Sequence, residues 1–484
     1  MPETDNRFRA LFQPRSVAFI GASNNTNKWG SIILANLING GFEGPIYPIN
    51  PQESEIRGLK SYARVADLNE TPDLAVIVIP PSAIPPVIDQ CTAKGIRAGL
   101  VITAGFAEVG IDGKQLQREM VNRARRGGMV LVGPNCNGMM RPSWKLYPTM
   151  DSLSPPPGPM AVVSQSGNVG VSIIRQLLRK GIGCSFYVGI GNEAYLHCED
   201  YFGYMVDDPD TKVILSYIEG LKDGRRFFET AKKVTKKKPI VMLKAGATSA
   251  GAKAAESHTA ALAGSDLAFD GACRQAGVIR ANNIEDLCNI GMAFIGQPLP
   301  KGKRIGIITA GGGWGVLAAD ACVKAGLEMP ALPVDTIAEL DRFLPAWWSR
   351  SNPVDLVGGL RPDHMRKSLE SLLRCAEIDG ILLLGLMAAL PVEPEPASAT
   401  QDVVMRRTDD MIRMVSEVFD DFICLAEPYQ KPVIIGSEFP STVPGFENLL
   451  APRLGEKGYI CYPQPDDAAK VMASLAGYAQ YVLS

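Results

Sequence analysis

The stretch Ser16-Val17-Ala18-Phe19-Ile20-Gly21-Ala22-Ser23 joins a short apolar run to a turn of small residues. A continuous apolar run of this length is typical of a strand buried on both faces of a parallel sheet. The pattern returns at residues 160–167, Met-Ala-Val-Val-Ser-Gln-Ser-Gly, and at residues 304–313, Arg-Ile-Gly-Ile-Ile-Thr-Ala-Gly-Gly-Gly. Other apolar runs alternate with helix-like stretches between these points. The sequence therefore predicts an α/β protein of doubly wound parallel sheets.

Two proline-rich segments separate three groups of predicted strands. One lies within residues 141–159 and contains Ser-Pro-Pro-Pro-Gly-Pro; the other, at residues 297–302, reads Gln-Pro-Leu-Pro-Lys-Gly. A chain of 484 residues is also too long for one ordinary hydrophobic core. We expect three domains, at about residues 1–145, 146–300 and 301–484.

The composition excludes several classes of protein. With 46% hydrophobic residues, 21% charged residues and a net charge of −2, we expect a cytoplasmic protein that binds neither nucleic acid nor membrane. The N-terminus has no pattern of a secretory signal. The ten cysteines form no CxxC pair and the three histidines are dispersed, so we predict no metal site.

The usual nucleotide motifs are missing from the sequence. The first turn has one glycine instead of Gly-x-Gly-x-x-Gly, and the second predicted strand ends at Asn50-Pro51 with no carboxylate for a ribose, which argues against a dehydrogenase. At residues 246–253 the lysine lies one place too far on for a Walker A loop. We therefore do not expect this chain alone to bind ATP in the ordinary way.

The three small-residue turns are candidate phosphate sites. A helix N-terminus presents unpaired N–H groups with a partial positive charge, and small residues let an anion approach closely. Such turns also serve simply to pack a helix against a strand, and this reading remains open for each of them.

His258 and Glu219 are the candidate catalytic residues. His258 lies in residues 254–261, Ala-Ala-Glu-Ser-His-Thr-Ala-Ala, just before a helix-like stretch, where a helix N-terminus favours the neutral, nucleophilic imidazole. Glu219 follows the apolar strand at residues 213–218, and a carboxylate there can orient a histidine. A polar cap for His258 and a rim contact for Glu219 remain the alternatives.

The order and spacing of many short motifs resemble the NDP-forming acyl-CoA synthetases. This superfamily includes the ADP-forming acetate–CoA ligases and, more distantly, succinyl-CoA synthetase. The resemblance runs nearly end to end, and its motifs lie at residues 20–23, 47–51, 78–80, 103–106, 133–138, 164–167, 191–192, 217–220, 256–260, 309–313 and 352–356. It implies a Rossmann-like CoA-binding domain followed by two flavodoxin-like CoA-ligase domains.

The resemblance also implies roles for single residues. His258 carries the phosphoryl group and Glu219 steadies it, as the catalytic pair. Two turns hold the phosphoryl group: Ser164, Gln165, Ser166 and Gly167, and Gly311, Gly312 and Gly313. The residues expected along the path of CoA are Gly21, Ala22, Ser23, Lys28, Asn50, Pro51, Pro80, Thr103, Ala104, Gly105 and Phe106. An acyl pocket is expected at Asn135, Asn192, Tyr195 and Asp200, with Tyr195 where many relatives carry aspartate.

The activity implied is the interconversion of a carboxylic acid, CoA and ATP with acyl-CoA, ADP and phosphate, through an acyl phosphate and a phosphohistidine. The ATP-grasp part of the family has no counterpart, since only a terminal helix is expected after Pro463. We therefore expect a separate ATP-grasp beta subunit that binds ATP or ADP with Mg, in a hetero-oligomer of the alpha2beta2 type acting on a small carboxylic acid. The alternative is a catalytically silent CoA-binding subunit with a regulatory or scaffold role. The presence of His258, Glu219 and both phosphate turns argues against it.

Overall fold

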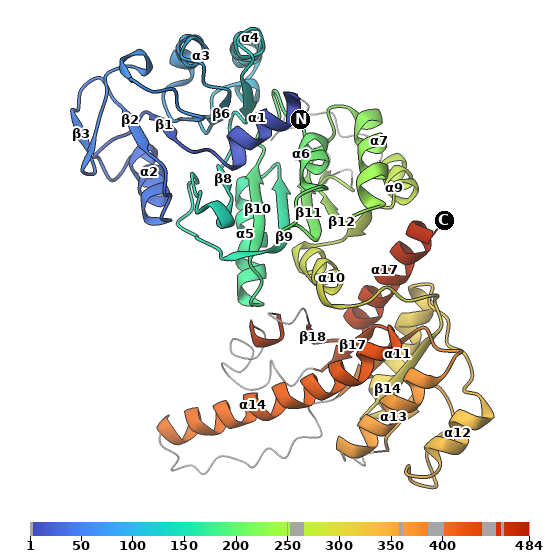
Figure 1. The fold of residues 1–484 in the computed structure, drawn as a ribbon. Helices are drawn as coiled ribbons and strands as arrows, with labels where there is room; N and C mark the ends of the chain where they lie inside the picture. The colour runs from blue at the N-terminus through green and yellow to red at the C-terminus, as the bar shows by residue number, and fades with distance from the viewer. Residues whose placement is uncertain are drawn as a thin grey trace. The chain divides into compact units, whose positions relative to one another are not determined.

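The computed structural model describes residues 3–248, 250–251, 266–357, 362–385, 401–437, 452–455 and 459–483 (Figure 1). His258 therefore lies outside the described residues. The chain forms two compact units. One comprises Met1–Gln176 and Gly183–Leu287, and the other comprises Leu177–Ile182 and Cys288–Ser484.

The first sheet is formed by five strands in the order β2-β1-β5-β6-β7, and all neighbours are parallel. Its central strands are completely buried, which explains why they are continuous apolar runs. The strands are β1 (Val17–Ile20), β2 (Ile46–Ile49), β5 (Leu74–Ile77), β6 (Ala98–Val101) and β7 (Val130–Val132), and the helices of this part are α1 (Glu3–Phe12), α2 (Trp29–Asn39), α3 (Ile84–Ala93) and α4 (Ile111–Arg126). A small hairpin, β3 (Glu55–Ile56) with β4 (Leu59–Lys60), forms a sheet of its own.

The second sheet has the order β13-β12-β11-β9-β10-β8 and is parallel except for β8, which runs antiparallel to β10 at one edge. Its strands are β8 (Met139–Met140), β9 (Pro157–Ser164), β10 (Cys184–Gly189), β11 (Val213–Ile218), β12 (Ile240–Lys244) and β13 (Ile279–Ala281). The helices are α5 (Gly167–Arg179), α6 (Cys198–Met205), α7 (Gly224–Thr235), α9 (Asp266–Gln275) and α10 (Ile284–Gly296).

The third sheet belongs to the second unit and is parallel throughout, in the order β15-β14-β16-β17-β18. Its strands are β14 (Ile305–Thr309), β15 (Val354–Asp355), β16 (Gly380–Leu384), β17 (Val433–Gly436) and β18 (Cys461–Tyr462). The helices are α11 (Gly312–Lys324), α12 (Val334–Leu340), α13 (Pro362–Arg374), α14 (Gln401–Ala426) and α17 (Pro465–Leu483). Helix α11 packs against α17, and α13 packs against α14.

Each sheet has the same pattern of connections around the strand that carries a small-residue turn. That strand, β1, β9 or β14, pairs with the next major strand on one side and with the one after it on the other. The order reverses at this point, so the carboxyl ends of β1 and β5, of β9 and β11, and of β14 and β16 form switch points, where ligands of open parallel sheets bind. The predicted α/β class of mainly parallel sheets is confirmed.

The first two sheets share one compact unit because helix α1 packs aromatic side chains onto the second sheet. The Phe12 ring lies 5.0 Å from Phe186 of β10, edge to face, and the Phe8 ring stacks 4.9 Å from Tyr204 of α6. These residues join a buried cluster that extends through both sheets. The predicted boundaries at residues 145 and 300 stay a prediction. Within the described ranges, no helix is long and apolar enough to cross a membrane.

Candidate active site

A hollow of about 760 Å³ lies at the carboxyl edge of the first sheet, at the switch point between β1 and β5. We call it the carboxyl-edge hollow. The sequence-predicted residues that line it are Gly21, Lys28, Pro80, Thr103, Ala104, Asn135, Gln165, Ser166, Gly167 and Asn192. One space therefore brings together residues predicted for CoA, for phosphate and for the acyl pocket.

Gly21 is required by backbone packing at the turn after β1. Its φ is +93°, and a Cβ there would lie 2.2 Å from the Val78 carbonyl oxygen. A Cβ on Gly30 of α2 would lie 1.9 Å from the Gly21 carbonyl oxygen. The glycines at this turn therefore serve to pack helix α2 closely against the edge of the hollow, which was one of the two interpretations of such turns.

Lys28 and Trp29 lie at the start of helix α2, which borders the hollow. Lys28 is the N-cap residue, exposed and without a side-chain capping bond, and the Trp29 side chain is 49% exposed. Both line the hollow. A cation and an indole at a helix N-terminus provide contacts for a phosphate and for a flat ring.

Several residues predicted for CoA do not line the hollow but support its walls. Asn50 Nδ2 donates to the Ala22 carbonyl oxygen at 2.8 Å, which fixes the first turn from β2. Ser23 is buried, and its Oγ accepts from the Asn25 backbone at 3.1 Å. Phe106 belongs to the core. Neither Pro51 nor Gly105 is among the lining residues.

Glu108 does not line the hollow but supports its wall, and sequence analysis did not single it out. Its Oε1 accepts from the backbone N–H of Gly105 at 2.6 Å and of Phe106 at 3.1 Å, so the carboxylate holds the turn after β6. Its Oε2 accepts from Asn192 at 2.5 Å. Burial opposes ionisation of Glu108, but the hydrogen bonds from Asn192 and the backbone outweigh it, and the pKa is lowered.

Asn135 and Asn192 meet at the hollow, as expected for residues of one pocket. Asn135 Nδ2 donates to Asn192 Oδ1 at 3.2 Å, and Asn135 has a φ of +56°. Tyr195 and Asp200 lie elsewhere. The Tyr195 ring faces the Arg125 guanidinium at 5.4 Å, and Asp200 accepts from the His197 backbone and pairs with Arg226. The acyl pocket stays a prediction, of whose four residues the structure brings Asn135 and Asn192 together.

Glu219 is joined directly to the small-residue turn that follows β9, which we predicted to bind phosphate. Gln165 Oε1 accepts from the backbone N–H of Glu219 and, at 3.2 Å, of Gly220. Ser164 Oγ donates to the Ser166 carbonyl at 2.6 Å, which closes the turn before α5. The Glu219 side chain is 6% exposed, and Tyr217 donates to its Oε1 at 3.4 Å. The carboxylate thus follows β11 at the carboxyl edge of the second sheet, as its position in the sequence predicted, and this edge is the switch point between β9 and β11.

Glu193 is a second carboxylate that sequence analysis did not find. It is 3% exposed and has a φ of +49°. Its Oε2 accepts from Gln165 Nε2, and its Oε1 accepts from the Cys198 backbone at 2.7 Å. Burial raises the pKa of Glu193 to about 7, although these hydrogen bonds act to lower it.

One wall of the hollow contains a thiol. Cys136 is buried, and its Sγ donates to the Val101 carbonyl at 3.3 Å. Burial raises the pKa of this thiol to about 12.

The third turn, Gly311 to Gly313, is open. Gly311 is the N-cap of α11, and its N–H donates to Thr309 Oγ1 at 3.2 Å. A Cβ on Gly311 or on Gly313 would meet no atom within 4 Å. Neither glycine is required for packing, in contrast to Gly21. This turn lies in the second unit.

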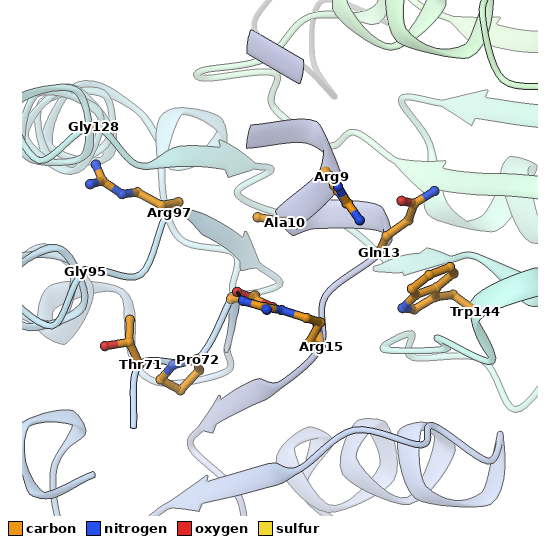
Figure 2. Close-up of a pocket in the computed structure, with 11 residues that line it drawn as sticks. Arg9, Ala10, Gln13, Arg15, Thr71, Pro72, Gly95, Arg97, Gly128 and Trp144 are labelled. Carbon is orange, nitrogen blue, oxygen red and sulfur yellow. Dashed lines mark hydrogen bonds and ion pairs between the residues drawn. The ribbon is translucent and has the colours of Figure 1, made fainter. Parts of the chain in front are cut away.

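A second hollow of about 680 Å³ lies at the opposite, amino edge of the first sheet (Figure 2). Arg9, Arg15, Arg97 and Trp144 line it, and Arg15 Nε pairs with Asp73 at 3.2 Å. None of the sequence-predicted site residues lies there. Because ligands of such sheets bind at the carboxyl edge, we centre the site on the first hollow. In the described ranges, no group of three or more His, Cys, Asp or Glu side chains is placed to hold a metal ion.

Comparison with protein families gives three consecutive matches. Residues 15–142 match a CoA binding domain, residues 157–294 match a succinyl-CoA ligase like flavodoxin domain, and residues 305–414 match a Ligase-CoA domain.

Individual relatives match the chain along its length. It is 38% identical over 474 residues to a Pyrococcus furiosus protein named acetate–CoA ligase (ADP-forming) II subunit alpha, and the match covers 98% of each chain. It is 43% identical over 359 residues to the acetate–CoA ligase (ADP-forming) of Methanocaldococcus jannaschii, and that match covers 74% of this chain and 50% of the relative.

A solved structure has the same fold over nearly the whole chain. It is described as a dinucleotide forming acetyl-coenzyme A synthetase 1 of Ca. Korarchaeum cryptofilum in complex with phosphate and ADP. The TM-score is 0.84 at 33% identity, and the match covers 99% of this chain and 98% of that one.

Proposed function

The chain belongs to the NDP-forming acyl-CoA synthetases, as a member of the alpha-subunit type of ADP-forming acetate–CoA ligase, and from this premise we propose that it forms and breaks a CoA thioester. The observation that carries the proposal is the carboxyl-edge hollow, which the CoA-binding part and the phosphate turn line together. The relatives' names make acetate the first acid to test.

CoA binds in the carboxyl-edge hollow in this proposal. Lys28 and the N-terminus of α2 supply positive charge for its phosphates, and Trp29 supplies a flat apolar surface. The turn at Thr103 and Ala104, held by Glu108, forms the wall along which the rest of the ligand lies. The thiol end reaches the part of the hollow formed by Gln165, Ser166 and Asn192.

The phosphoryl carrier is His258, with Glu219 accepting a hydrogen bond from the opposite ring nitrogen. The support is the position of Glu219, which is held by Gln165 beside a helix N-terminus that can stabilise phosphoryl charge. The turn at Gly311 to Gly313 provides a second helix N-terminus with open space for an anion.

The reaction proceeds in three steps. The P–O bond of ATP breaks as a P–N bond to His258 forms, and ADP leaves. An oxygen of the carboxylate, the ionised form of the acid, then attacks phosphorus, the P–N bond breaks, and the products are an acyl phosphate and free imidazole. Finally the CoA sulfur, its proton lost to solvent, attacks the acyl carbon, the C–O bond to phosphate breaks, and phosphate leaves. Each step is reversible.

A separate ATP-grasp beta subunit supplies the nucleotide, with Mg, in a complex of the alpha2beta2 type. Two facts support this. A full-length relative is named a subunit alpha, and the chain spans about half of a relative named as the whole ligase. We place the complex in the cytoplasm, where the free thiols found at all ten cysteines are kept reduced.

A labelling experiment tests this function. The chain is mixed with a candidate ATP-grasp partner and ATP labelled in the γ-phosphate, or with acetyl-CoA and labelled phosphate. We expect an acid-labile, base-stable label on this chain that Glu219→Gln weakens and His258→Ala abolishes. His364→Ala, a change on α13 in the other unit, is the matched control and should label normally. An active preparation without label, or a labelled and active His258→Ala variant, rules the proposal out. A chain that binds CoA but gives neither label nor turnover with any partner would be the silent subunit.

A further inference from the structure

Glu193 presents both carboxylate oxygens to N–H donors in a buried position beside the phosphate turn. One oxygen accepts from the Cys198 backbone at 2.7 Å, and the other accepts from Gln165 Nε2. An ionised carboxylate accepts with both oxygens, whereas an amide or a protonated carboxyl group places a hydrogen at one of them. Ionised Glu193 is therefore the form that accepts both hydrogen bonds with no hydrogen of its own competing at either oxygen.

The Gln165 amide connects Glu193 to Glu219. Its oxygen accepts from the backbone N–H of Glu219 and Gly220, and its nitrogen donates to the Gly220 carbonyl at 2.8 Å and to Glu193. If this amide reversed, its NH₂ group would face two N–H donors and its oxygen would face a carbonyl and a carboxylate. The negative charge of Glu193 strengthens the observed orientation because a charge-assisted hydrogen bond is stronger than a neutral one.

We propose that ionised Glu193 is a positioning residue that fixes the Gln165 amide, and through it Glu219, so that the phosphoryl carrier is charged efficiently. This inference rests on the proposed function of Glu219 and His258. Glu193 itself does not line the hollow, and its effect passes through Gln165.

The surroundings of Glu193 make this role depend on pH. The nearby ionisable groups are His197 and Lys222, whose charges favour ionisation, and Cys198 and Tyr201, whose own ionisation Glu193 opposes. Burial is the largest influence and raises the pKa to about 7. Protonation below that pH removes the charge that strengthens the hydrogen bond from Gln165 and so loosens the Gln165 amide, and the charging rate should fall as the pH falls through about 7.

The test uses the full chain with its partner and measures the rate of phosphoryl labelling from pH 5.5 to pH 8.5, together with the dissociation constant of CoA. For Glu193→Gln we expect labelling that is roughly tenfold slower at pH 8, no inflection near pH 7, and unchanged CoA binding. Glu193→Asp keeps the charge and should recover the inflection. In a Gln165→Leu background, Glu193→Gln should have no further effect.

Glu199→Gln is the matched control, because Glu199 is a buried carboxylate six residues along the same segment that bonds His197 and not Gln165. It should keep both the wild-type rate and the inflection. The inference is overturned if Glu193→Gln labels at the wild-type rate with the wild-type inflection, or if the two variants lose activity alike. Failure of the proposed function is distinct, since in that case the wild-type protein acquires no label.

Discussion

At the scale of the residue, burial and hydrogen bonding favour opposite protonation states of Glu193. Its buried position favours the neutral acid, whereas its two N–H partners match the carboxylate. A folded-state pKa of about 7, above the ordinary 4.5, means that the native protein holds this proton more tightly than the unfolded chain does. The stability that this group contributes is therefore fully present below pH 4.5 and is lost as the pH rises through 7. Strain of this kind is common where a site needs a charged group.

Glu193→Gln should reveal this linkage in stability measurements. Glutamine does not titrate, so the free energy of unfolding of the wild type, relative to that of the variant, should fall by on the order of 3 kcal/mol between pH 4.5 and pH 8. Urea unfolding of both proteins at several pH values measures the difference, in which the titration of all other groups cancels. A difference that stays constant with pH would show that Glu193 titrates normally.

The sequence predicts the residues whose side-chain position is set by a neighbouring strand. It does not predict residues whose position is set by the conformation of an irregular segment. Glu219 was predicted because the residue after a parallel strand must lie at the carboxyl edge. Glu193 lies in an irregular segment after β10, and no periodicity shows that its side chain turns inward to Gln165. Glu108 reaches Asn192 across 84 residues of sequence. Tyr195 and Asp200 point to Arg125 and Arg226 because of tertiary packing, which spacing alone does not reveal.

At the scale of the element, the same strand-turn-helix unit occurs three times. The space around the glycines of its turn differs from one occurrence to the next. The turn after β1 is filled by packing, whereas the turn before α11 leaves open space at Gly311 and Gly313. Open space at a helix N-terminus with no structural need for glycine is what an anion site requires. A substitution of Gly311 or Gly313 can therefore impair anion binding without impairing folding.

Gly313→Ala should keep the fold and lower the turnover. The new methyl group meets no atom within 4 Å, and alanine loses less backbone entropy than glycine when it enters a helix, by roughly 0.5–1 kcal/mol in a helix interior. The methyl group would occupy the space of a phosphoryl group, so turnover with the partner should fall at least tenfold while the melting temperature stays level or rises. Gly21→Ala is the contrast: its Cβ would collide with the Val78 carbonyl, so stability itself should fall. Normal turnover of Gly313→Ala would remove the third turn from the mechanism.

At the scale of the whole molecule, the two candidate binding features belong to different compact units. All residues that line the carboxyl-edge hollow belong to the unit that contains the first two sheets, and the open turn at Gly311 belongs to the other unit. The aromatic packing of α1 explains why two predicted domains behave as one compact body. Two compact units joined in one chain are expected to unfold separately.

Calorimetry should therefore resolve two transitions, of which CoA shifts only one. At a CoA concentration of about 100 times the dissociation constant, the unit with the hollow should gain roughly 2.7 kcal/mol and the other should gain nothing. Gly313→Ala should respond to CoA as the wild type does, whereas Lys28→Ala should show a smaller shift. Movement of both transitions together would mean that the units unfold as one or that CoA contacts both.

The buried thiol in the wall of the hollow has a chemical consequence for a protein that handles acylating agents. Sulfur attacks an acyl group as the thiolate, and Cys136, with its pKa near 12, carries almost none at neutral pH. Of the ten cysteines, all within the described ranges, only Cys424 is exposed. The protein's own sulfur in this wall is therefore inert toward an activated acid at neutral pH. The catalyst is protected against acylating itself, and an alkylating reagent should mark Cys424 long before it reaches the site.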